Sequence, residues 1–399
     1  MAMKKILIIA NFNRNYSKQD YGRFIQIANN LSYQYEVEIV TSDFDHLTKG
    51  RAEDKHVNWP FRITKLKEIG YPKNVCLKRF VSHFLWGKEV RKYIRGSELP
   101  NLIYCAVPSL TGSLEAVRFA KENNIPAIVD IQDLWPEAFK MAINIPILSD
   151  VLFSPFTRRA NEIYRNADDI IAVSDTYLKR AKRVNNKVEK GHVIFLGSRL
   201  SDFDRYVEKY KAEQDDKGIR LAYCGTLGSS YDITCVIDAL SIIKKKGINP
   251  PEFIVMGSGP RLDEFKKYAL EKNVKVEFTG RLPYPEMCGL LCSCDIAINP
   301  ISKGAAQSII NKHADYAASG LPIINTQENR EYRSLITTYN MGFNCENNDP
   351  EDLAQKIILL MNDEKLRIEM GINARKCAEE RFNKEKTYDE ITEAVNALL

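Results

Sequence analysis

The stretch RLAYCGTLGSSYD at residues 220–232 places a short apolar run directly before two glycines and several small hydroxyl residues. An apolar run of this length, followed by a helical pattern from Ile233, is typical of a buried strand that feeds a helix. Backbone N–H groups and the helix dipole attract phosphate at such a junction. Gly225, Thr226 and Gly228 are therefore candidate phosphate-binding residues, and a tight turn without a ligand is the alternative.

The same alternation of apolar runs and helical stretches recurs on both sides of residues 220–232. It predicts an α/β protein with parallel sheets flanked by helices. In the second half the further runs are Glu252–Met256, Val274–Thr279, Ile296–Pro300 and Pro322–Asn325. In the first half they are Lys5–Ala10, Val37–Thr41, Leu102–Cys105, Ala127–Asp130, Asp169–Val173 and His192–Leu196.

A chain of 399 residues is too long for one ordinary core, so two domains are expected. The charged segment 198–218 lacks a clear strand pattern, and residues 213–218 within it are interpreted as a linker. We therefore predict a first Rossmann-like domain at 1–199 and a second at 217–382. We expect the C-terminal helix, residues 383–399, to pack back on the first domain.

Charge is divided unevenly along the chain. The net charge is +5, but residues 1–200 carry +10 and the remainder carries −5. The first half therefore suits an anionic partner, unless its basic residues only form a solvated surface. No apolar run is long enough to cross a membrane, and Lys5–Ala10 is too short for a signal peptide. We expect a cytoplasmic protein.

Two sequence patterns suggest a metal, and for both we expect none. Cys288, Cys292 and Cys294 cluster, but they lie in an apolar stretch without a second Cys/His group, so core packing is favoured over zinc. The triplets 43–45 and 202–204 have the form Asp-x-Asp, which can hold Mg²⁺ or Mn²⁺ against a diphosphate. Short acidic triplets are also common by chance. We predict no metal and no other cofactor.

Two further loops of the second half follow strand-like runs, where open parallel sheets bind ligands. Gly257, Ser258 and Gly259 would let a ligand approach the backbone or would make a turn. They do not complete a dinucleotide fingerprint, because Leu262 occupies the last position. After Ile296–Pro300, small residues precede Lys312 and Asp315, which could bind a diphosphate and a sugar hydroxyl or could simply face solvent.

In the first half the stretch DIQDLWPE, residues 130–137, follows a strand-like run. Asp130, Asp133, Trp135 and Glu137 offer three carboxylates and an indole, which suit hydrogen bonds to sugar hydroxyls and stacking on a sugar face. The alternative is a capped turn with Trp135 in the core.

These motifs together resemble the family-four retaining glycosyltransferases, which have the GT-B fold of two Rossmann-like domains with an interdomain cleft. The likeness is greatest to their bacterial capsule and O-antigen amino-sugar branch, and it covers nearly the whole chain. It rests on residues 130–137, 223–228, 257–260, 278–281, 311–316 and 320–322.

The resemblance implies a nucleotide-sugar donor and a role for each matching position. Gly225–Gly228 would approach the donor diphosphate, Arg281 and Leu282 would lie beside the base, and Asp315 would contact the ribose or sugar. Gly22 and Arg23 match the start of the first helix near the reaction centre. The implied catalytic residues are Asp133, Arg23 and Lys312. The implied donor-binding residues are Gly225, Thr226, Gly228, Gly257, Ser258, Arg281, Leu282, Gln307, Ser308, Lys312 and Asp315. The implied acceptor-binding residues are Gly22, Asp130, Trp135 and Glu137.

Several positions depart from the family pattern. Gln307 and Asp315 stand where many members have glutamates, and Thr226 and Tyr231 stand where many have Arg and Lys. Gln132 replaces a frequent His. Lys312 and Arg281 would then supply the positive charge.

The resemblance favours retaining transfer from a UDP-linked sugar, such as an N-acetylamino sugar, to a lipid-linked or oligosaccharide acceptor in bacterial surface polysaccharide synthesis. The alternatives are a nucleotide-sugar epimerase on the same fold and a degenerate, non-catalytic partner subunit.

The segment Lys73–Arg95 carries seven basic residues and one acid among apolar and aromatic residues. This composition suits a helix that docks the protein on the anionic inner face of the plasma membrane. The alternative is that the apolar face packs on the domain's own sheet. No nucleic-acid partner is expected.

Overall fold

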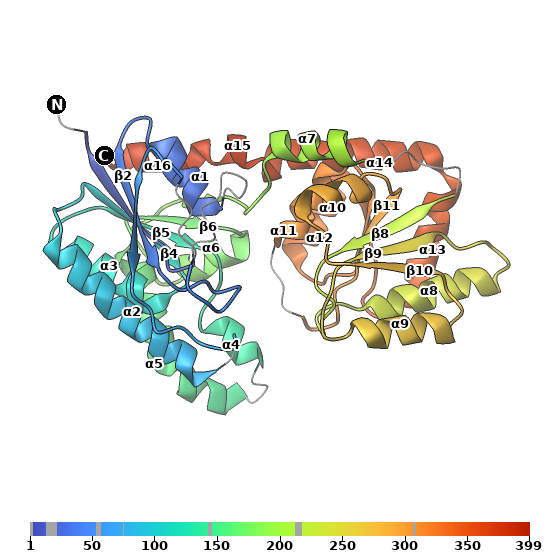
Figure 1. Cartoon of the computed structure of the whole chain (residues 1–399), viewed down its shortest axis with the longest axis horizontal. Coiled ribbons are helices and arrows are strands. Elements are labelled where there is room, and N and C mark those ends of the chain that lie inside the picture. Colours follow the sequence, from blue (N-terminus) through green and yellow to red (C-terminus); the bar gives the residue numbers. More distant parts are fainter. Residues whose placement is uncertain are drawn as a thin grey trace. The chain divides into compact units, whose positions relative to one another are not determined.

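The structure is a computed structural model, and it describes residues 3–12, 22–52, 57–74, 76–142, 146–211, 218–305 and 309–399. The side chains of residues 140–142 and 146–150 lie outside this description. The chain forms two compact units, residues 1–195 with 388–399, and residues 196–387. Both are α/β units built on parallel sheets (Figure 1), which confirms the predicted fold class.

The first unit holds a seven-stranded parallel sheet in the order β3-β2-β1-β4-β5-β6-β7. Its strands are β1 (Lys5–Ile9), β2 (Glu36–Ser42), β3 (Arg62–Leu66), β4 (Leu102–Val107), β5 (Ala127–Ile131), β6 (Asp169–Ala172) and β7 (His192–Val193). Its helices are α1 (Arg23–Leu31), α2 (Leu77–Gly96), α3 (Leu110–Glu122), α4 (Glu137–Ala142), α5 (Pro146–Asn166), α6 (Asp175–Lys182) and α16 (Asp389–Leu398).

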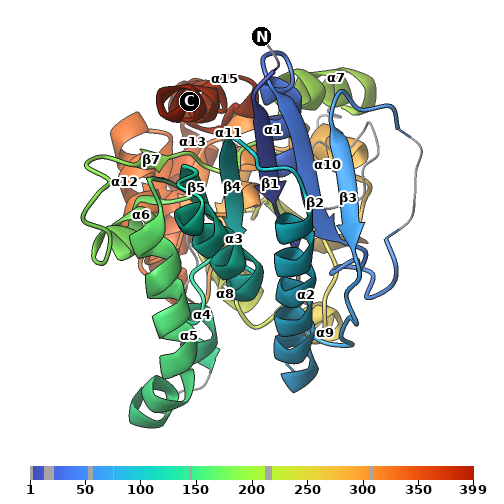
Figure 2. The same cartoon turned by 90° about the vertical axis from the view of Figure 1, so that its left-hand side faces the viewer.

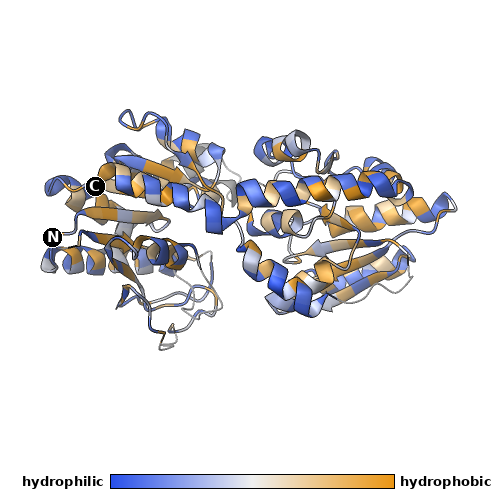
Figure 3. Ribbon diagram, turned by 90° about the horizontal axis from the view of Figure 1, so that it is seen from above, coloured by the Kyte–Doolittle hydropathy of each residue, from blue (hydrophilic) through white to orange (hydrophobic). Residues whose placement is uncertain are grey.

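Alternate residues of the first sheet face two different cores. Leu7 and Ile9 of β1 belong to the core beneath α2, α3 and α5, whereas Ile6 and Ile8 belong to the core shared with α1 and α16. Because both faces are covered, central strands such as β1 and β4 read as nearly continuous apolar runs, and much of the sheet has the hydrophobic colour in Figure 3. The C-terminal helix α16 contributes Ile391 and Val395 to the second of these cores.

The second unit holds a six-stranded parallel sheet in the order β10-β9-β8-β11-β12-β13. Its strands are β8 (Arg220–Cys224), β9 (Glu252–Met256), β10 (Val276–Gly280), β11 (Ile296–Asn299), β12 (Ile323–Asn325) and β13 (Gly342–Asn344). Its helices are α7 (Leu200–Tyr210), α8 (Ile233–Lys245), α9 (Leu262–Glu271), α10 (Tyr284–Leu291), α11 (Asn311–Ala318), α12 (Arg330–Tyr339), α13 (Pro350–Asn362), α14 (Glu364–Cys377), a π-helical turn (Ala378–Phe382) and α15 (Lys384–Thr387).

Two charged segments of the sequence are helical in the structure. Residues 200–210, which lie between the two predicted domains, form α7, which buries Leu200 and Phe203 and packs on α10 within the second unit. The predicted linker, residues 213–218, lies outside the described residues except for Gly218. The apolar residues of segment 73–95 divide between two environments. Trp86, Val90 and Ile94 of α2 are buried in the core, whereas the first turns of that helix expose apolar side chains.

In each sheet, successive strands are first added on one side and then on the other. The change of side falls between β1 and β4 in the first unit and between β8 and β11 in the second. Ligands of open parallel sheets bind beyond the carboxyl ends of the strands at this switch point. The loops that follow β8 and β11 are therefore where a ligand of the second unit is expected.

Candidate functional site

The loops after β8 and β11 are joined to each other by hydrogen bonds. The N–H of Asp232 donates to the carbonyl of Pro300 at 2.9 Å, and the N–H of Ser302 donates to the carbonyl of Ser230 at 3.0 Å. The Asp232 carboxylate in turn accepts from the N–H of Cys235 and caps α8. At the switch point of the second sheet, the loops after β8 and β11 thus form a hydrogen-bonded backbone rim beside the start of α8.

Glycines let the rim pack closely. A Cβ on Gly257 would lie 1.8 Å from the carbonyl oxygen of Gly225, so the loops after β8 and β9 touch backbone to backbone. Gly225 has φ +146°, and a Cβ there would lie 2.8 Å from Nζ of Lys312. Around Gly228 the nearest atom to a Cβ is the Thr226 methyl at 3.9 Å, so this side of the loop is open. Gly225 and Gly257 therefore have structural reasons to be glycine, and Gly228 and exposed Thr226 border free space.

Lys312 lies in the first turn of α11 and its side chain reaches the rim. Its ammonium lies 4.4 Å from the ring centroid of Tyr223 and 3.8 Å from that of Tyr231, and it donates a hydrogen bond to the Tyr223 hydroxyl at 3.3 Å. Within the described residues no carboxylate forms an ion pair with it. Burial lowers the pKa of Lys312 to about 7. The site thus holds a desolvated amine that lacks an anion.

Asp315, one turn further along α11, faces other partners. Its carboxylate accepts hydrogen bonds from the Tyr284 hydroxyl at 2.7 Å and from the Ser198 hydroxyl at 3.1 Å. Burial raises the pKa of Asp315, while these two donors oppose the rise. In this structure Asp315 links α11 to α10 and to the chain before α7, and its role toward a donor stays a prediction.

The other predicted donor-binding residues are exposed or half-buried, or they lie outside the described residues. Ser258 and Arg281 are exposed and Leu282 is half-buried, each just after a strand of the second sheet. Gln307 and Ser308 lie outside the described residues.

Sequence reasoning missed a ladder of two buried asparagines and one half-buried asparagine at the carboxyl ends of three strands. Asn299, Asn325 and Asn344 are in register on β11, β12 and β13. Asn299 donates to Asn325 at 2.8 Å, and Asn325 donates to Asn344 at 2.8 Å. His313 of α11 lies 3.3 Å from the Asn299 amide and stacks on Tyr332. The ladder fixes the strand ends against α11, and its signal in the sequence is an Asn closing each of three short apolar runs.

In the first unit Arg23 and Asp130 form a buried ion pair. The Arg23 Nε lies 2.7 Å from Asp130 Oδ2, and the Tyr104 hydroxyl donates to the same oxygen at 2.6 Å. Arg23 also donates to the Tyr388 hydroxyl before α16 and to the carbonyl of Ile194. Gly22 is the residue that precedes α1. The pair therefore joins α1, β5 and the C-terminal segment, a structural role that the sequence did not predict.

The stretch after β5 folds as the alternative interpretation described. Asp133 accepts from the Leu134 N–H at 2.9 Å and from the Trp135 indole N–H at 3.1 Å, and burial raises its pKa. Trp135 is a core residue, 5% exposed and stacked on His83. Glu137 pairs with Arg180 at 2.5 Å. The indole N–H is therefore bound by Asp133 and the ring is packed in the core, and the acceptor contact of Trp135 stays a prediction.

The Asp-x-Asp triplets are engaged in local contacts. Asp43 pairs with Arg51 at 2.6 Å, and Asp45 accepts from the N–H of Leu47 at 2.7 Å. Asp202 pairs with Arg205, and Asp204 pairs with Arg375. Among the described residues, no three His, Cys, Asp or Glu side chains are grouped as metal ligands would be. The described helices include none that is long and apolar enough to span a membrane.

Known proteins resemble this chain in sequence and in fold. Residues 204–377 match the family model described as glycosyl transferases group 1. A probable glycosyltransferase, WbjE of Pseudomonas aeruginosa, is 26% identical over 57% of this chain and 58% of its own length. The capsular polysaccharide biosynthesis glycosyltransferase CapM of Staphylococcus aureus is 26% identical over 58% of this chain and 62% of its own. The chain thus spans about 60% of the curated relatives it matches.

The fold as a whole matches a solved structure. HepE of Anabaena, solved in complex with UDP, has a TM-score of 0.68 and 14% identity, covering 99% of this chain and 100% of its own. At this identity the likeness shows the shared fold, that of the GT-B glycosyltransferases.

Proposed function

We propose that this chain is a glycosyltransferase that moves a sugar, with retention of configuration, from a UDP-linked donor to an acceptor. The observation that carries the proposal is Lys312, a buried amine without an anion at the switch point of the second sheet. The match of residues 204–377 to group 1 glycosyl transferases and the UDP complex of the structurally similar HepE support it.

The second unit would act on the departing diphosphate. Negative charge develops on UDP as the glycosidic bond breaks, and donors already in place stabilise it most in a water-poor site. Lys312 would supply the charge, and the open side of the loop at Gly228 would supply backbone N–H groups. Arg281, exposed after β10, would lie toward the base. No carboxylate is assigned as a covalent nucleophile.

The acceptor would bind the first unit beside Asp133 and Gly22. We propose a lipid-linked or oligosaccharide acceptor in surface polysaccharide synthesis, with CapM as the relative whose name supports this. The excess positive charge of residues 1–200 supports contact with an anionic membrane surface. The proposed enzyme needs no metal or other cofactor.

A ligand screen tests the donor. Thermal shift against UDP, GDP and ADP should show the largest stabilisation by UDP, because a ligand that binds only the folded state raises its stability. Lys312→Ala should remove most of that shift, whereas Lys246→Ala, an exposed lysine at the opposite end of α8, should not. An equal response in both variants would remove Lys312 from the site.

Activity assays then separate transfer from the other possible activities. A UDP-sugar incubated alone should stay unchanged, and product should form only when an acceptor is added. Conversion of the donor without an acceptor would indicate an epimerase. UDP binding without any turnover on a panel of acceptors would indicate a partner subunit.

A further inference from the structure

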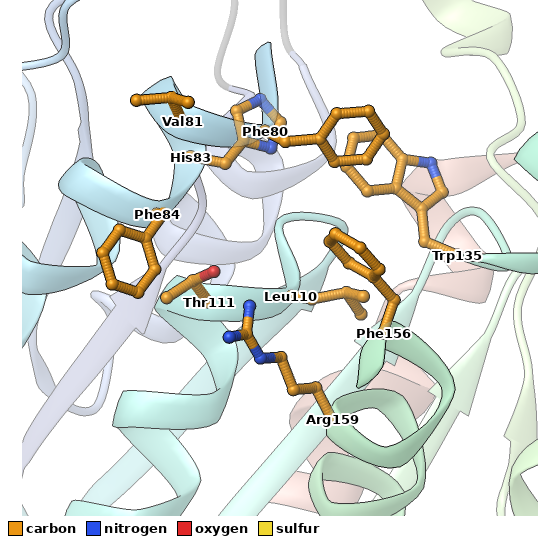
Figure 4. Close-up of a pocket in the computed structure, with 9 residues that line it drawn as sticks. All are labelled: Phe80, Val81, His83, Phe84, Leu110, Thr111, Trp135, Phe156 and Arg159. Carbon is orange, nitrogen blue, oxygen red and sulfur yellow. The ribbon is translucent and has the colours of Figure 1, made fainter. Parts of the chain in front are cut away.

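A cavity of about 250 Å³ lies in the first unit among α2, α3, α5 and the loop after β5 (Figure 4). Its wall is mostly apolar, with Phe80 and Phe84 on α2, Phe156 on α5, Leu110 at the start of α3, and Trp135. The ring centroid of Phe80 lies 5.2 Å from that of Phe156, so the aromatic wall joins α2 to α5.

The cavity exists because the helices α2, α3 and α5 begin at different levels. α2 and α3 touch closely, since a Cβ on Gly112 would lie 2.2 Å from the Trp86 ring and a Cβ on Gly87 would lie 2.4 Å from the Thr111 methyl. The N-terminal turns of α2 and α5 extend beyond the start of α3 (Figure 2). Leu110 and Thr111 therefore form the floor of a space that no helix fills.

Two polar side chains in this apolar wall have no hydrogen-bond or ion-pair partner among the described residues. Both ring nitrogens of His83 are buried without a hydrogen bond, and burial lowers the pKa of this imidazole to about 3. Arg159 extends its guanidinium into the cavity (Figure 4) and pairs with no described carboxylate. Arg159 lies 5.8 Å from the Phe156 ring centroid and has no carboxylate partner among the described residues, so it suits a ligand that carries an anionic group.

The apolar wall of the cavity reaches the protein surface on α2, where Val81 is 51% exposed and Phe84 is 40% exposed. On α5, Leu152 is 58% exposed one turn before Phe156. A sugar in such a cavity would lose hydrogen bonds to water that these walls cannot replace. A hydrocarbon chain would gain contact at no such cost, and an exposed apolar patch of this kind marks a binding or membrane surface.

We propose that this cavity binds the lipid part of the acceptor, with a hydrocarbon chain against Phe80, Phe84 and Phe156 and its phosphate paired with Arg159. The proposal rests on the transferase function and names its acceptor class as a lipid phosphate. Binding is non-covalent, and the sugar-accepting end of the lipid would extend toward the loop after β5. Lys88, whose ammonium lies 4.8 Å from the Phe84 ring centroid, adds positive charge at the mouth.

A fluorescence titration tests this with dodecyl phosphate whose chain carries bromine, used below its micelle concentration. The chain has three tryptophans, and Trp135 is the one that lines the cavity. Bromine quenches only an indole that it contacts, so quenching should saturate and should disappear in Trp135→Phe. Affinity should rise from butyl to dodecyl phosphate in the wild-type protein, because each methylene adds buried apolar surface.

Two neighbouring arginines provide a matched pair of variants. Arg159→Gln should weaken dodecyl phosphate roughly tenfold through loss of a charge-assisted hydrogen bond, while Arg158→Gln, whose side chain is exposed outside the cavity, should change affinity less than about twofold. Equal losses in both variants, equal binding of dodecyltrimethylammonium, or no gain with chain length would each overturn the proposal. UDP binding, measured separately by calorimetry, tests the transferase function and should be the same in both variants.

Discussion

Replacing Lys312 by Met should make the ligand-free protein more stable while weakening its binding of UDP. Methionine has a similar length and can occupy the space between Tyr223 and Tyr231 without a charge. The wild-type protein must bury an amine at this position, and the substitution removes that cost. A residue kept for binding at the expense of stability is expected at a functional site.

The size of the effect follows from the pKa of Lys312, which burial lowers from 10.5 to about 7. At about 1.4 kcal/mol per pH unit, this difference corresponds to roughly 5 kcal/mol as an upper bound. The cation–π contacts to Tyr223 and Tyr231 are lost in the variant, and each contributes on the order of 1 kcal/mol. The expected net gain in unfolding free energy is about 1–3 kcal/mol near pH 6.

The pH dependence has a definite sign. Because the folded pKa of Lys312 lies below its unfolded value, the cost is fully present below about pH 7. Between about pH 7 and 10.5 the unfolded chain binds more protons, so wild-type stability rises with pH relative to the variant. The advantage of Lys312→Met should therefore shrink on going from pH 6 to pH 9.

Scanning calorimetry of the full chain measures these differences, with Lys246→Met as the exposed-lysine control. Comparison of variants at each pH cancels the other titrating groups that are distant from Lys312. Titration with UDP should show affinity reduced by roughly 10- to 100-fold in Lys312→Met. A ligand-free Lys312→Met protein that is less stable than the wild type at pH 6, or that binds UDP equally well, would refute the reasoning.

Four further predictions concern other parts of the molecule. The pKa of His192 is raised to about 9 by hydrogen bonds to Asp169 and Glu390, so its stabilisation is complete below pH 6.5 and is lost as pH rises through 9. His192→Gln should therefore lower the unfolding free energy by about 1–2 kcal/mol near pH 6 and by little near pH 10, as urea denaturation would show. Asp130→Ala should cost about 3–5 kcal/mol, measured by thermal melting, because it leaves the Arg23 guanidinium buried without a counter-ion. Transfer activity should survive EDTA, and a loss restored by Mn²⁺ would contradict the metal-independent proposal. The protein should sediment with anionic but not neutral vesicles, and indifference to anionic vesicles at low salt would count against membrane contact.

Local pattern in the sequence was sufficient for the fold class and for most strands. Runs such as Ile6–Ala10 and Leu221–Cys224 are apolar because both faces of each sheet are covered, and this property is visible without tertiary structure. Two strands at sheet edges, β3 and β13, were missed because Arg62–Leu66 and Gly342–Asn344 are only half-buried and carry a mixed pattern. The α7 helix was not predicted because its apolar residues are few and widely spaced.

The candidate site was predicted in part, since loop position after a strand can be read from the sequence. Gly225, Gly257 and Lys312 are brought together at the switch point as parallel-strand topology requires. The partners of each side chain could not be predicted in this way. Asp315 and Asp130 were chosen for their carboxylates, but the fold supplies them with donors from residues far apart in the sequence, such as Ser198 and Arg23.

The sequence by itself thus determined the two parallel α/β units and the loops that can meet a ligand, because strand and helix periodicity and glycine position are local properties. Only the tertiary structure decided which charges are neutralised, because ion pairs and burial depend on residues that are distant along the chain. It buried the carboxylate of Asp130 against Arg23, left the amine of Lys312 between two tyrosines, and opened a cavity around Arg159 where three helices begin at different levels.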